Sequence, residues 1–260
     1  MAGESALKNM HRFYLPPDEC QNSALTLTGR EAHHGLRVLR LRKGEHVVVL
    51  NGMGKSFNCE VTSLSRDTIG LIAKDSQETP APPCEVTLVQ AIPKGKLFDS
   101  IIQKATELGV SSVVPLLSER VITQIDEGNS DSKTDHWRMV AIEAIKQCGS
   151  PWLPTIQPAA SPVEVLARKE PFDLFLIASL QPGSRHAREW FDEFRQREKR
   201  EPKSVCVWVG PEGDFTEAEV TAALAAGAAP ITLGRLVLRC ETAATYCLSV
   251  LNYETQSLQA

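Results

Sequence analysis

The stretch from Val205 to Tyr253 constrains the fold more than any other part of this 260-residue chain. It begins with the apolar run Val205–Val209, whose length and β-branched content predict a buried strand. The run passes directly into a glycine-containing loop, Gly210–Phe215, and then into Thr216–Glu219, a capping box that predicts the start of a helix. Strand, loop and helix in this order form the repeating unit of open α/β sheets, where ligands bind at the carboxyl ends of strands.

A second strand-to-helix loop follows within the same stretch. Ile231–Gly234 predicts a short strand, and Cys240–Thr242 opens a last helix with apolar residues at helical spacing. Arg239 lies just before this helix and Glu241 in its first turn. We therefore expect two loops side by side at one edge of a sheet, with the functional site at that edge.

From Glu85 onwards, strand and helix patterns alternate, which predicts an α/β domain with a mainly parallel sheet covered on both faces. We place this domain at residues 85–260. Besides the stretch described above, its expected elements are strands at 86–92, 112–117 and 174–180 and helices at 97–108, 136–148, 162–169 and 185–200.

Residues 1–74 are expected to form a small β-rich domain, joined to the next by a polar and then proline-rich linker at 75–84. Within it, the segment Arg30–Lys43 carries five Lys/Arg residues against one Glu. Charge alone leaves two interpretations of this segment open, a solvated helix or loop face and a surface that contacts nucleic-acid phosphates. Strands are expected at 12–15, 46–50, 56–64 and 68–74.

Composition narrows the class of protein. The formal net charge of −4 excludes a chain that is basic throughout, although a local basic patch remains compatible with it. Seven cysteines without a CxxC pair favour reduced, mostly buried thiols over a disulfide framework or a zinc site. No apolar run approaches the roughly 18 residues of a membrane span, and the first residues lack the apolar core of a signal peptide. We therefore expect a cytoplasmic protein.

The candidate site residues admit more than one role when they are taken singly. Gly210–Phe215 matches neither a P-loop nor a dinucleotide fingerprint, so it is either an ordinary turn or the rim of a pocket for a neutral, adenosine-like group. Arg239 and Glu241 form either a local ion pair at a helix start or a charge-stabilising pair for a substrate. His33 and His34 are adjacent and so do not share a helix face, which argues against a metal site.

Taken in order, the motifs of the chain resemble the bacterial 16S ribosomal RNA uracil-N3 methyltransferase family, which belongs to the SPOUT superfamily of trefoil-knotted methyltransferases. The resemblance covers nearly the whole chain. It rests on Arg12-Phe13-Tyr14, His34 with Val38-Leu39-Arg40, Gln103–Val110, Ser118-Glu119-Arg120, Glu143 with Gln147-Cys148-Gly149, Gly210–Gly213, Leu233-Gly234 and Leu238–Ala243. Two positions depart from the family pattern: Asp214 stands where the GPEGG loop ends in glycine, and Ser150 where relatives often carry arginine.

The resemblance implies a knotted C-terminal domain, an N-terminal PUA-like β-barrel, and a homodimer with the active site near the subunit interface. It implies that S-adenosylmethionine binds among three loops, with no metal. The cofactor-binding residues implied are Ala178, Leu180, Gly210, Pro211, Glu212, Gly213, Leu233, Gly234 and Leu238, and the RNA-binding residues are Arg12, His34, Arg37 and Arg40.

The expected reaction is methyl transfer to N3 of an unpaired or flipped-out uridine in 16S rRNA. Arg239 would stabilise negative charge on the uracil oxygens, and Glu241 would orient Arg239 or pass the N3 proton to water. Two alternatives stay open: a SPOUT methyltransferase that modifies a ribose 2′-OH or another base, and a non-catalytic RNA-binding assembly factor with the same fold.

Overall fold

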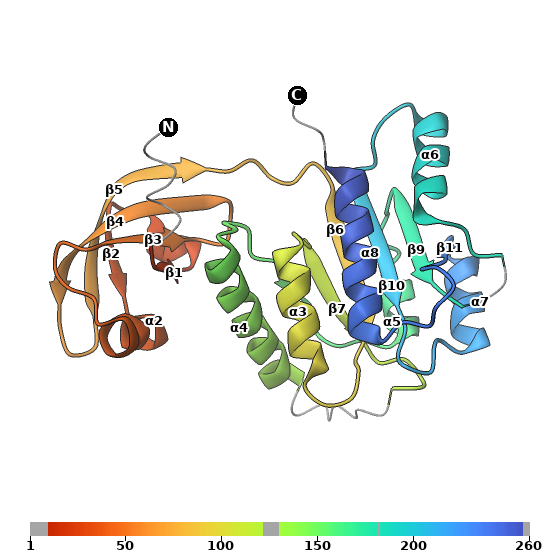
Figure 1. Cartoon of the computed structure of the whole chain (residues 1–260), viewed down its shortest axis with the longest axis horizontal. Coiled ribbons are helices and arrows are strands. Elements are labelled where there is room, and N and C mark those ends of the chain that lie inside the picture. Colours follow the sequence, from red (N-terminus) through yellow and green to blue (C-terminus); the bar gives the residue numbers. More distant parts are fainter. Residues whose placement is uncertain (1–9, 122–129, 181–182, 257–260) are drawn as a thin grey trace. The chain divides into compact units, whose positions relative to one another are not determined.

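The structure, a computed structural model, describes residues 10–121, 130–180 and 183–256. The outer ends of the two expected domains, residues 1–9 and 257–260, lie outside these ranges. The chain divides into two compact units (Figure 1). The first comprises Met1–Ala81 and Ile142–Leu153, and the second comprises Pro82–Ala141 and Pro154–Ala260.

The first unit is built on a five-stranded sheet in the order β1-β3-β4-β5-β2. Its neighbouring strands are antiparallel except for the parallel pair β1 and β3. The register between β4 and β5 shifts at two irregular points, and such bulges bend and twist a sheet. The strands are β1 (Arg12–Tyr14), β2 (Ala24–Leu27), β3 (His46–Leu50), β4 (Lys55–Leu64) and β5 (Ile69–Glu78).

Two features of this sheet differ from the sequence-based prediction. β2 was not predicted, because it is short and pairs as an edge strand with β5 alone. β5 extends to Glu78, into the expected linker, because its polar end pairs with β4: Asn58 donates to Asp75 over 2.6 Å and Lys55 lies 3.6 Å from Glu78. Polar composition alone does not separate a linker from the exposed end of a hairpin.

The basic segment folds into two short helical turns, α2 (Gly29–His33) and the π-helical η2 (His34–Leu39). Gly35 is buried in η2, and a Cβ atom there would approach the Cδ1 of Ile69 to 2.5 Å, so glycine permits the close packing of η2 on the sheet. Arg40 ends η2 in the left-handed conformation, with φ 54° and ψ 45°.

Residues 142–153 complete the first unit. The Gly54 amide donates to the Pro151 carbonyl over 2.9 Å, and the Leu153 amide donates to the Gly52 carbonyl over 3.0 Å. Gly54 has φ +85°, and a Cβ atom there would lie 2.4 Å from the Trp152 ring. Glycine is therefore required at this position for two reasons, its backbone conformation and the contact with Trp152.

The second unit contains a six-stranded sheet in the order β11-β9-β10-β6-β7-β8, in which every pairing is parallel. This confirms the α/β class predicted from the alternating pattern. In Figure 1, α3 and α8 lie in front of the sheet and α5 lies behind it. The strands are β6 (Glu85–Ala91), β7 (Ser112–Leu116), β8 (Thr155–Ile156), β9 (Leu174–Ala178), β10 (Ser204–Val209) and β11 (Ala229–Ile231).

The helices of the second unit follow the predicted order with small shifts of boundary. They are α3 (Leu97–Glu107), α4 (Ser130–Cys148), α5 (Pro162–Ala167), α6 (Ala187–Glu198), α7 (Glu217–Ala225) and α8 (Cys240–Thr255). The prediction placed the start of α4 at 136, because its first turns are polar and lack apolar spacing. Among the described residues, no helix is both long enough and apolar enough to cross a membrane.

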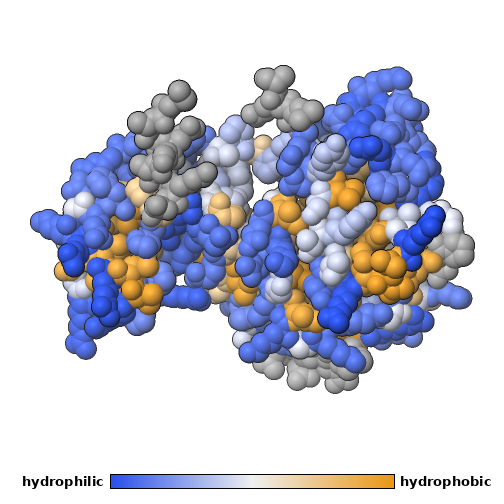
Figure 2. Space-filling view, in the orientation of Figure 1, coloured by the Kyte–Doolittle hydropathy of each residue, from blue (hydrophilic) through white to orange (hydrophobic). Residues whose placement is uncertain are grey.

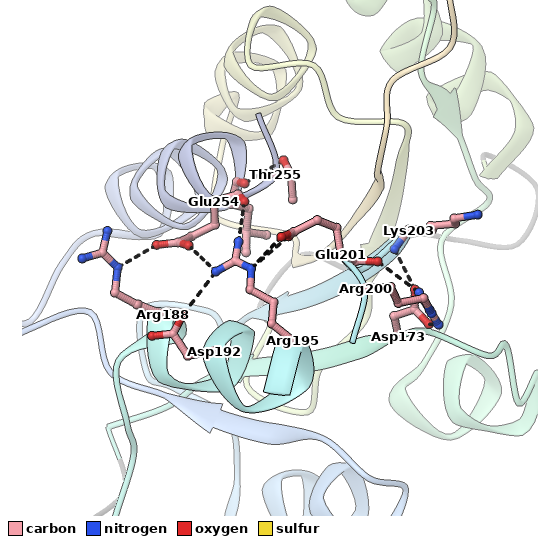
Figure 3. A network of polar contacts seen from close by, with 10 residues as sticks. Asp173, Arg188, Asp192, Arg195, Arg200, Glu201, Lys203, Glu254 and Thr255 are labelled. Atoms are coloured by element: carbon pink, nitrogen blue, oxygen red, sulfur yellow. Dashed lines mark hydrogen bonds and ion pairs between the residues drawn. The ribbon is translucent and has the colours of Figure 1, made fainter. Parts of the chain in front are cut away.

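A network of charged side chains holds the C-terminal end of α8 against α6 (Figure 3). The buried Glu254 carboxylate accepts from Arg188 over 3.0 Å and from Arg195 over 3.2 Å. Arg195 also donates to the Glu254 carbonyl and to Glu201. Charge-assisted bonds of this kind are the stronger ones in proteins, so the helix that begins beside Arg239 is fixed at its far end.

The strand predicted at 231–234 begins and ends earlier, at Ala229–Ile231. β11 is the edge strand of this sheet: it pairs with β9 on one side and forms only an isolated bridge with Arg185 on the other, and such an edge position accommodates Pro230. Leu233 and Gly234 therefore lie in the loop after the strand and not within it.

Candidate functional site

A cavity of about 320 Å³ lies at the carboxyl ends of β9, β10 and β11. These three strands are parallel neighbours, so the loops that follow them meet at one edge of the sheet. Eight of the nine expected cofactor-binding residues line the cavity, and Gly213 is the exception. The eight are Ala178, Leu180, Gly210, Pro211, Glu212, Leu233, Gly234 and Leu238.

The loop after β10 has a defined shape. The Asp214 amide donates to the Pro211 carbonyl over 2.9 Å, which closes a four-residue turn, and Asp214 has φ +60°. Phe215 then turns inward and packs against Trp208, with 6.0 Å between ring centroids. A Cβ atom at Gly210 would lie 3.2 Å from the Phe215 ring, so this loop packs tightly on the core that supports it.

Glu219, in the first turn of α7, ties this loop to the end of β7. Its carboxylate accepts from the Thr216 amide over 2.8 Å, from the Glu119 amide over 2.9 Å and from the Ser118 hydroxyl over 3.3 Å. Burial opposes the charged form, but these hydrogen bonds outweigh it and lower the pKa of Glu219 below its usual value. A buried, ionised carboxylate thus holds the loop after β10 against the end of β7.

Gly213 faces away from the cavity, toward Arg120. The Arg120 guanidinium donates to the Gly213 carbonyl, and a Cβ atom at Gly213 would lie 3.5 Å from the Arg120 side chain. The expectation that Gly213 lines the pocket beside Glu212 is therefore not met by its position. Its position indicates a supporting role, in which Arg120 braces the turn from outside.

The loop after β11 is shaped by Thr232 and Gly234. The Gly234 amide donates to the Thr232 hydroxyl over 3.2 Å, and Gly234 has φ +105°, which favours glycine. Leu236 and Val237 follow, with 76% and 75% of their surface exposed. Apolar side chains reach the surface beside α8 and this loop (Figure 2), so the rim of the cavity is apolar and accessible.

Arg239 and Glu241 flank Cys240, which lines the cavity at the start of α8. Arg239 is exposed, and within the described ranges neither residue forms an ion pair. The ion pair considered from the sequence is thus not formed, and the Arg239 guanidinium is available to a substrate. Burial, together with the Glu212 and Glu241 carboxylates, raises the pKa of the Cys240 thiol to about 12, so the thiol is not a nucleophile at neutral pH.

The four expected RNA-binding residues all lie in the first unit but differ in surroundings. Arg37 and Arg40 are exposed on η2, and no ion pair is recorded for either in the part of the chain that is described. His34 is half-buried, with its ring edge-on to Phe13 at 6.3 Å.

Arg12 is engaged differently. Its guanidinium donates to the carbonyls of Lys146 and Gln147, at 3.3 and 3.2 Å, and so caps the C-terminus of α4. Nearby, Glu31 accepts from the Tyr14 amide over 3.1 Å and from the buried Lys146 ammonium over 2.8 Å. Arg12 therefore connects two sequence motifs that lie far apart in the chain.

Sequence reasoning missed part of the cavity wall. Thr232 is the neighbour of a predicted residue, and its place in a loop between strand and helix was the available signal. Gly183 and Ser184 follow β9, and no sequence motif marks them. The other lining residues not predicted are Val209, Asp214, Cys240 and Ala243, whereas Ser179, Arg235, Leu236 and Val237 lie within the strand end and the loop that the family resemblance assigns to the cofactor. In the described segments, no group of three or more His, Cys, Asp or Glu side chains is arranged to hold a metal.

Comparison with known proteins identifies the class. Residues 80–252 match the RNA methyltransferase domain family, and residues 27–72 match the RNA methyltransferase PUA domain family. The parallel α/β unit with its three-loop cavity, joined to a curled β unit, thus defines a SPOUT-type RNA methyltransferase with an N-terminal PUA domain.

Individual relatives narrow this further. A Synechocystis ribosomal RNA small subunit methyltransferase E is 32% identical over 248 residues, which cover 93% of this chain and 77% of the relative. The chain belongs to the ribosomal RNA small subunit methyltransferase E family, which confirms the resemblance seen in the sequence.

Two solved structures of similar proteins contain a cofactor. The Neisseria gonorrhoeae ribosomal RNA small subunit methyltransferase E, bound to S-adenosyl methionine, superposes with a TM-score of 0.81 at 29% identity, over 94% of this chain and 98% of that one. A Legionella pneumophila protein in complex with the bound cofactor SAM superposes with a TM-score of 0.85 at 29% identity, over the same shares of the two chains.

Proposed function

We propose that this protein transfers a methyl group from S-adenosylmethionine to N3 of a uridine in 16S ribosomal RNA. The observation that carries the proposal is the cavity at the ends of β9, β10 and β11, where three loops far apart in sequence form one pocket. Its volume, about 320 Å³, is within the usual range for sites that bind small molecules.

The cavity suits an adenosine-containing cofactor. Backbone groups at the strand ends and in the turn that begins at Gly210 offer donors and acceptors for a neutral base and ribose, while Ala178, Leu233 and Leu238 supply apolar walls. When bound, the cofactor supplies an activated methyl group on a positively charged sulfur. The residues of this chain then have to position the uracil and remove its N3 proton.

Arg239 is the residue best placed to act on the uracil. It is exposed, it is not held by an ion pair among the described residues, and both of its neighbours in the chain, Leu238 and Cys240, line the cavity. A guanidinium there stabilises the negative charge that develops on the uracil oxygens as the N3 proton leaves. Glu241 lies in the first turn of α8, where the helix dipole stabilises its carboxylate, and either orients Arg239 or accepts the proton.

Residues 1–74 serve as the RNA-binding domain in this proposal. Arg37 and Arg40 are exposed three residues apart, so both can contact phosphates of one RNA segment, and His34 lies beside them. Arg12 contributes mainly by fixing the C-terminus of α4, since its guanidinium is bonded to two carbonyls there.

We also propose that the protein is a homodimer with the active site near the subunit interface. Leu236 and Val237 beside the cavity and Tyr246 and Tyr253 on the outer side of α8 are exposed apolar and aromatic residues. Such side chains gather at protein interfaces. Because the proposed substrate is ribosomal RNA, we place the activity in the cytoplasm.

The test is nucleoside analysis of small ribosomal subunits after incubation with the purified protein and S-adenosylmethionine. We expect 3-methyluridine, and we expect Arg239→Ala to lose most turnover while a thermal shift with S-adenosylhomocysteine shows that the cofactor still binds. A ligand at 100 times its Kd adds about 2.7 kcal/mol of stability.

Each of the other outcomes would indicate a different function for this protein. A 2′-O-methylated nucleoside, or a different methylated base, would show a methyltransferase with another target. No modification and no thermal shift with either ligand would show a non-catalytic RNA-binding factor. Full turnover by Arg239→Ala would refute the role given to Arg239.

A further inference from the structure

Three residues that line the cavity carry a charge at neutral pH: Glu212, Asp214 and Arg235. The lining side chains therefore have a net charge of −1. Asp214 is the half-buried member of the three, whereas Glu212 and Arg235 are exposed and can turn into solvent. A charged group that is held in the cavity wall interacts electrostatically with a bound ligand more strongly than a mobile, solvated charged group does.

The backbone at Asp214 would suit glycine better. Its φ of +60° is left-handed, a conformation that glycine adopts without strain and other L-residues adopt at a cost. Aspartate tolerates this conformation better than most residues because its side chain bonds locally, so the turn fixes an acidic side chain in the wall of the cavity.

Two backbone amides hold the Asp214 carboxylate in place. Oδ1 accepts from the Phe215 amide over 2.8 Å, and Oδ2 accepts from the Leu180 amide over 3.4 Å. Leu180 follows β9, so Asp214 also connects two of the three loops that form the cavity. An ionised carboxylate has about four acceptor positions, so this one keeps capacity for a ligand after both bonds are made.

We infer that Asp214 makes the cavity discriminate between the methyl donor and its product. This inference rests on the proposed function. In methyl transfer the bond from sulfur to methyl breaks, the bond from N3 to methyl forms, and sulfur keeps the electron pair. The donor carries one positive charge more than the thioether product, so a fixed carboxylate in the wall favours binding of the donor over binding of the product.

The test is calorimetric titration of the full-length protein with S-adenosylmethionine and, separately, with S-adenosylhomocysteine. Asp214→Asn keeps the shape of the side chain without its charge, and Asp214→Gly removes the whole side chain while suiting the left-handed turn. Glu217→Gln is the matched control, because Glu217 is an exposed acid three residues away that does not line the cavity. It removes the same charge from the chain.

For both Asp214 variants we expect the Kd for S-adenosylmethionine to rise at least about fivefold, the factor for two unit charges about 4 Å apart at the dielectric constant of water. The Kd for S-adenosylhomocysteine should stay within about twofold, and Glu217→Gln should change neither. An equal loss for both ligands would show that Asp214 acts only as a loop connector and would overturn the inference, as would unchanged affinities. If the wild-type protein bound neither ligand, the proposed function itself would fail.

Discussion

One substitution at Arg40 tests both the cost of its left-handed backbone conformation and the RNA contact proposed for its side chain. Arg40 ends η2 with φ 54° and ψ 45°, a left-handed conformation. That conformation costs an L-residue about 1–2 kcal/mol, and glycine loses about 0.5–1 kcal/mol of chain entropy on folding instead. Arg40→Gly should therefore raise the free energy of unfolding by about 0.5–1 kcal/mol. The same substitution removes an exposed guanidinium, so it should weaken RNA binding.

Lys199 provides the matched control. It ends α6 in the second unit with φ 54° and ψ 29°, and it carries the same charge. Lys199→Gly should give a similar gain in stability and leave RNA affinity unchanged. Urea unfolding measures the first quantity, and filter binding to small ribosomal subunits at several salt concentrations measures the second.

The salt dependence makes the result quantitative. If Arg40→Gly removes one phosphate contact, the slope of log K against log salt concentration should fall in magnitude by about 0.7–0.9. Lys199→Gly should leave the slope unchanged. Equal affinities and slopes for the two variants would refute the RNA contact of Arg40. A loss of stability in Arg40→Gly would refute the backbone argument, whatever happened to RNA binding.

Two further predictions concern carboxylates of the second unit. Glu219→Gln should lower the free energy of unfolding by about 2–3 kcal/mol in urea melts and weaken S-adenosylmethionine binding. The reason is that an amide cannot accept all the hydrogen bonds that the Glu219 carboxylate accepts from Ser118, Glu119 and Thr216. A stability equal to that of Glu217→Gln would contradict this prediction. Hydrogen bonding to Arg200 lowers the pKa of Asp173 to about 2, from 3.8, so its contribution of about 1–2 kcal/mol is present above pH 4 and lost as the pH falls toward 2. Asp173→Asn should thus differ from wild type more in melts at pH 7 than in melts at pH 2, and an equal difference at the two pH values would show another cause.

The order of strands and helices in the second unit was predictable because each element has a distinct apolar pattern. Val205–Val209 and its neighbours are continuous apolar runs, as expected for strands buried on both faces. β8 was missed, since two residues leave no pattern. β11 was placed too late, because an edge strand tolerates Pro230 and its boundary depends on its pairing with β9, which no local pattern reveals. The trefoil knot expected from the family resemblance stays a prediction.

The rule that parallel strands end at one edge predicted the location of the site, whereas the individual cofactor-binding residues were implied by the family resemblance. That rule brings Leu180, Gly210 and Leu233 together from three separate loops. It gives no information about which way a residue faces, so it did not distinguish Gly213, which contacts Arg120, from Glu212, which lines the cavity. The capping of α4 by Arg12 joins residues 134 or more positions apart, which no local pattern reveals.

The contribution of residues 142–153 to the first unit has a consequence for synthesis on the ribosome. Gly52 and Gly54 lack their partners until Leu153 has left the exit tunnel, although Ala81 emerged long before. At about 5–20 residues per second, the intervening 72 residues take roughly 4–14 s to translate. During that interval the nascent β unit is incomplete, and the basic segment near Arg40 emerges before the unit that carries it can finish folding. The N-terminal unit is thus translated first but completed late.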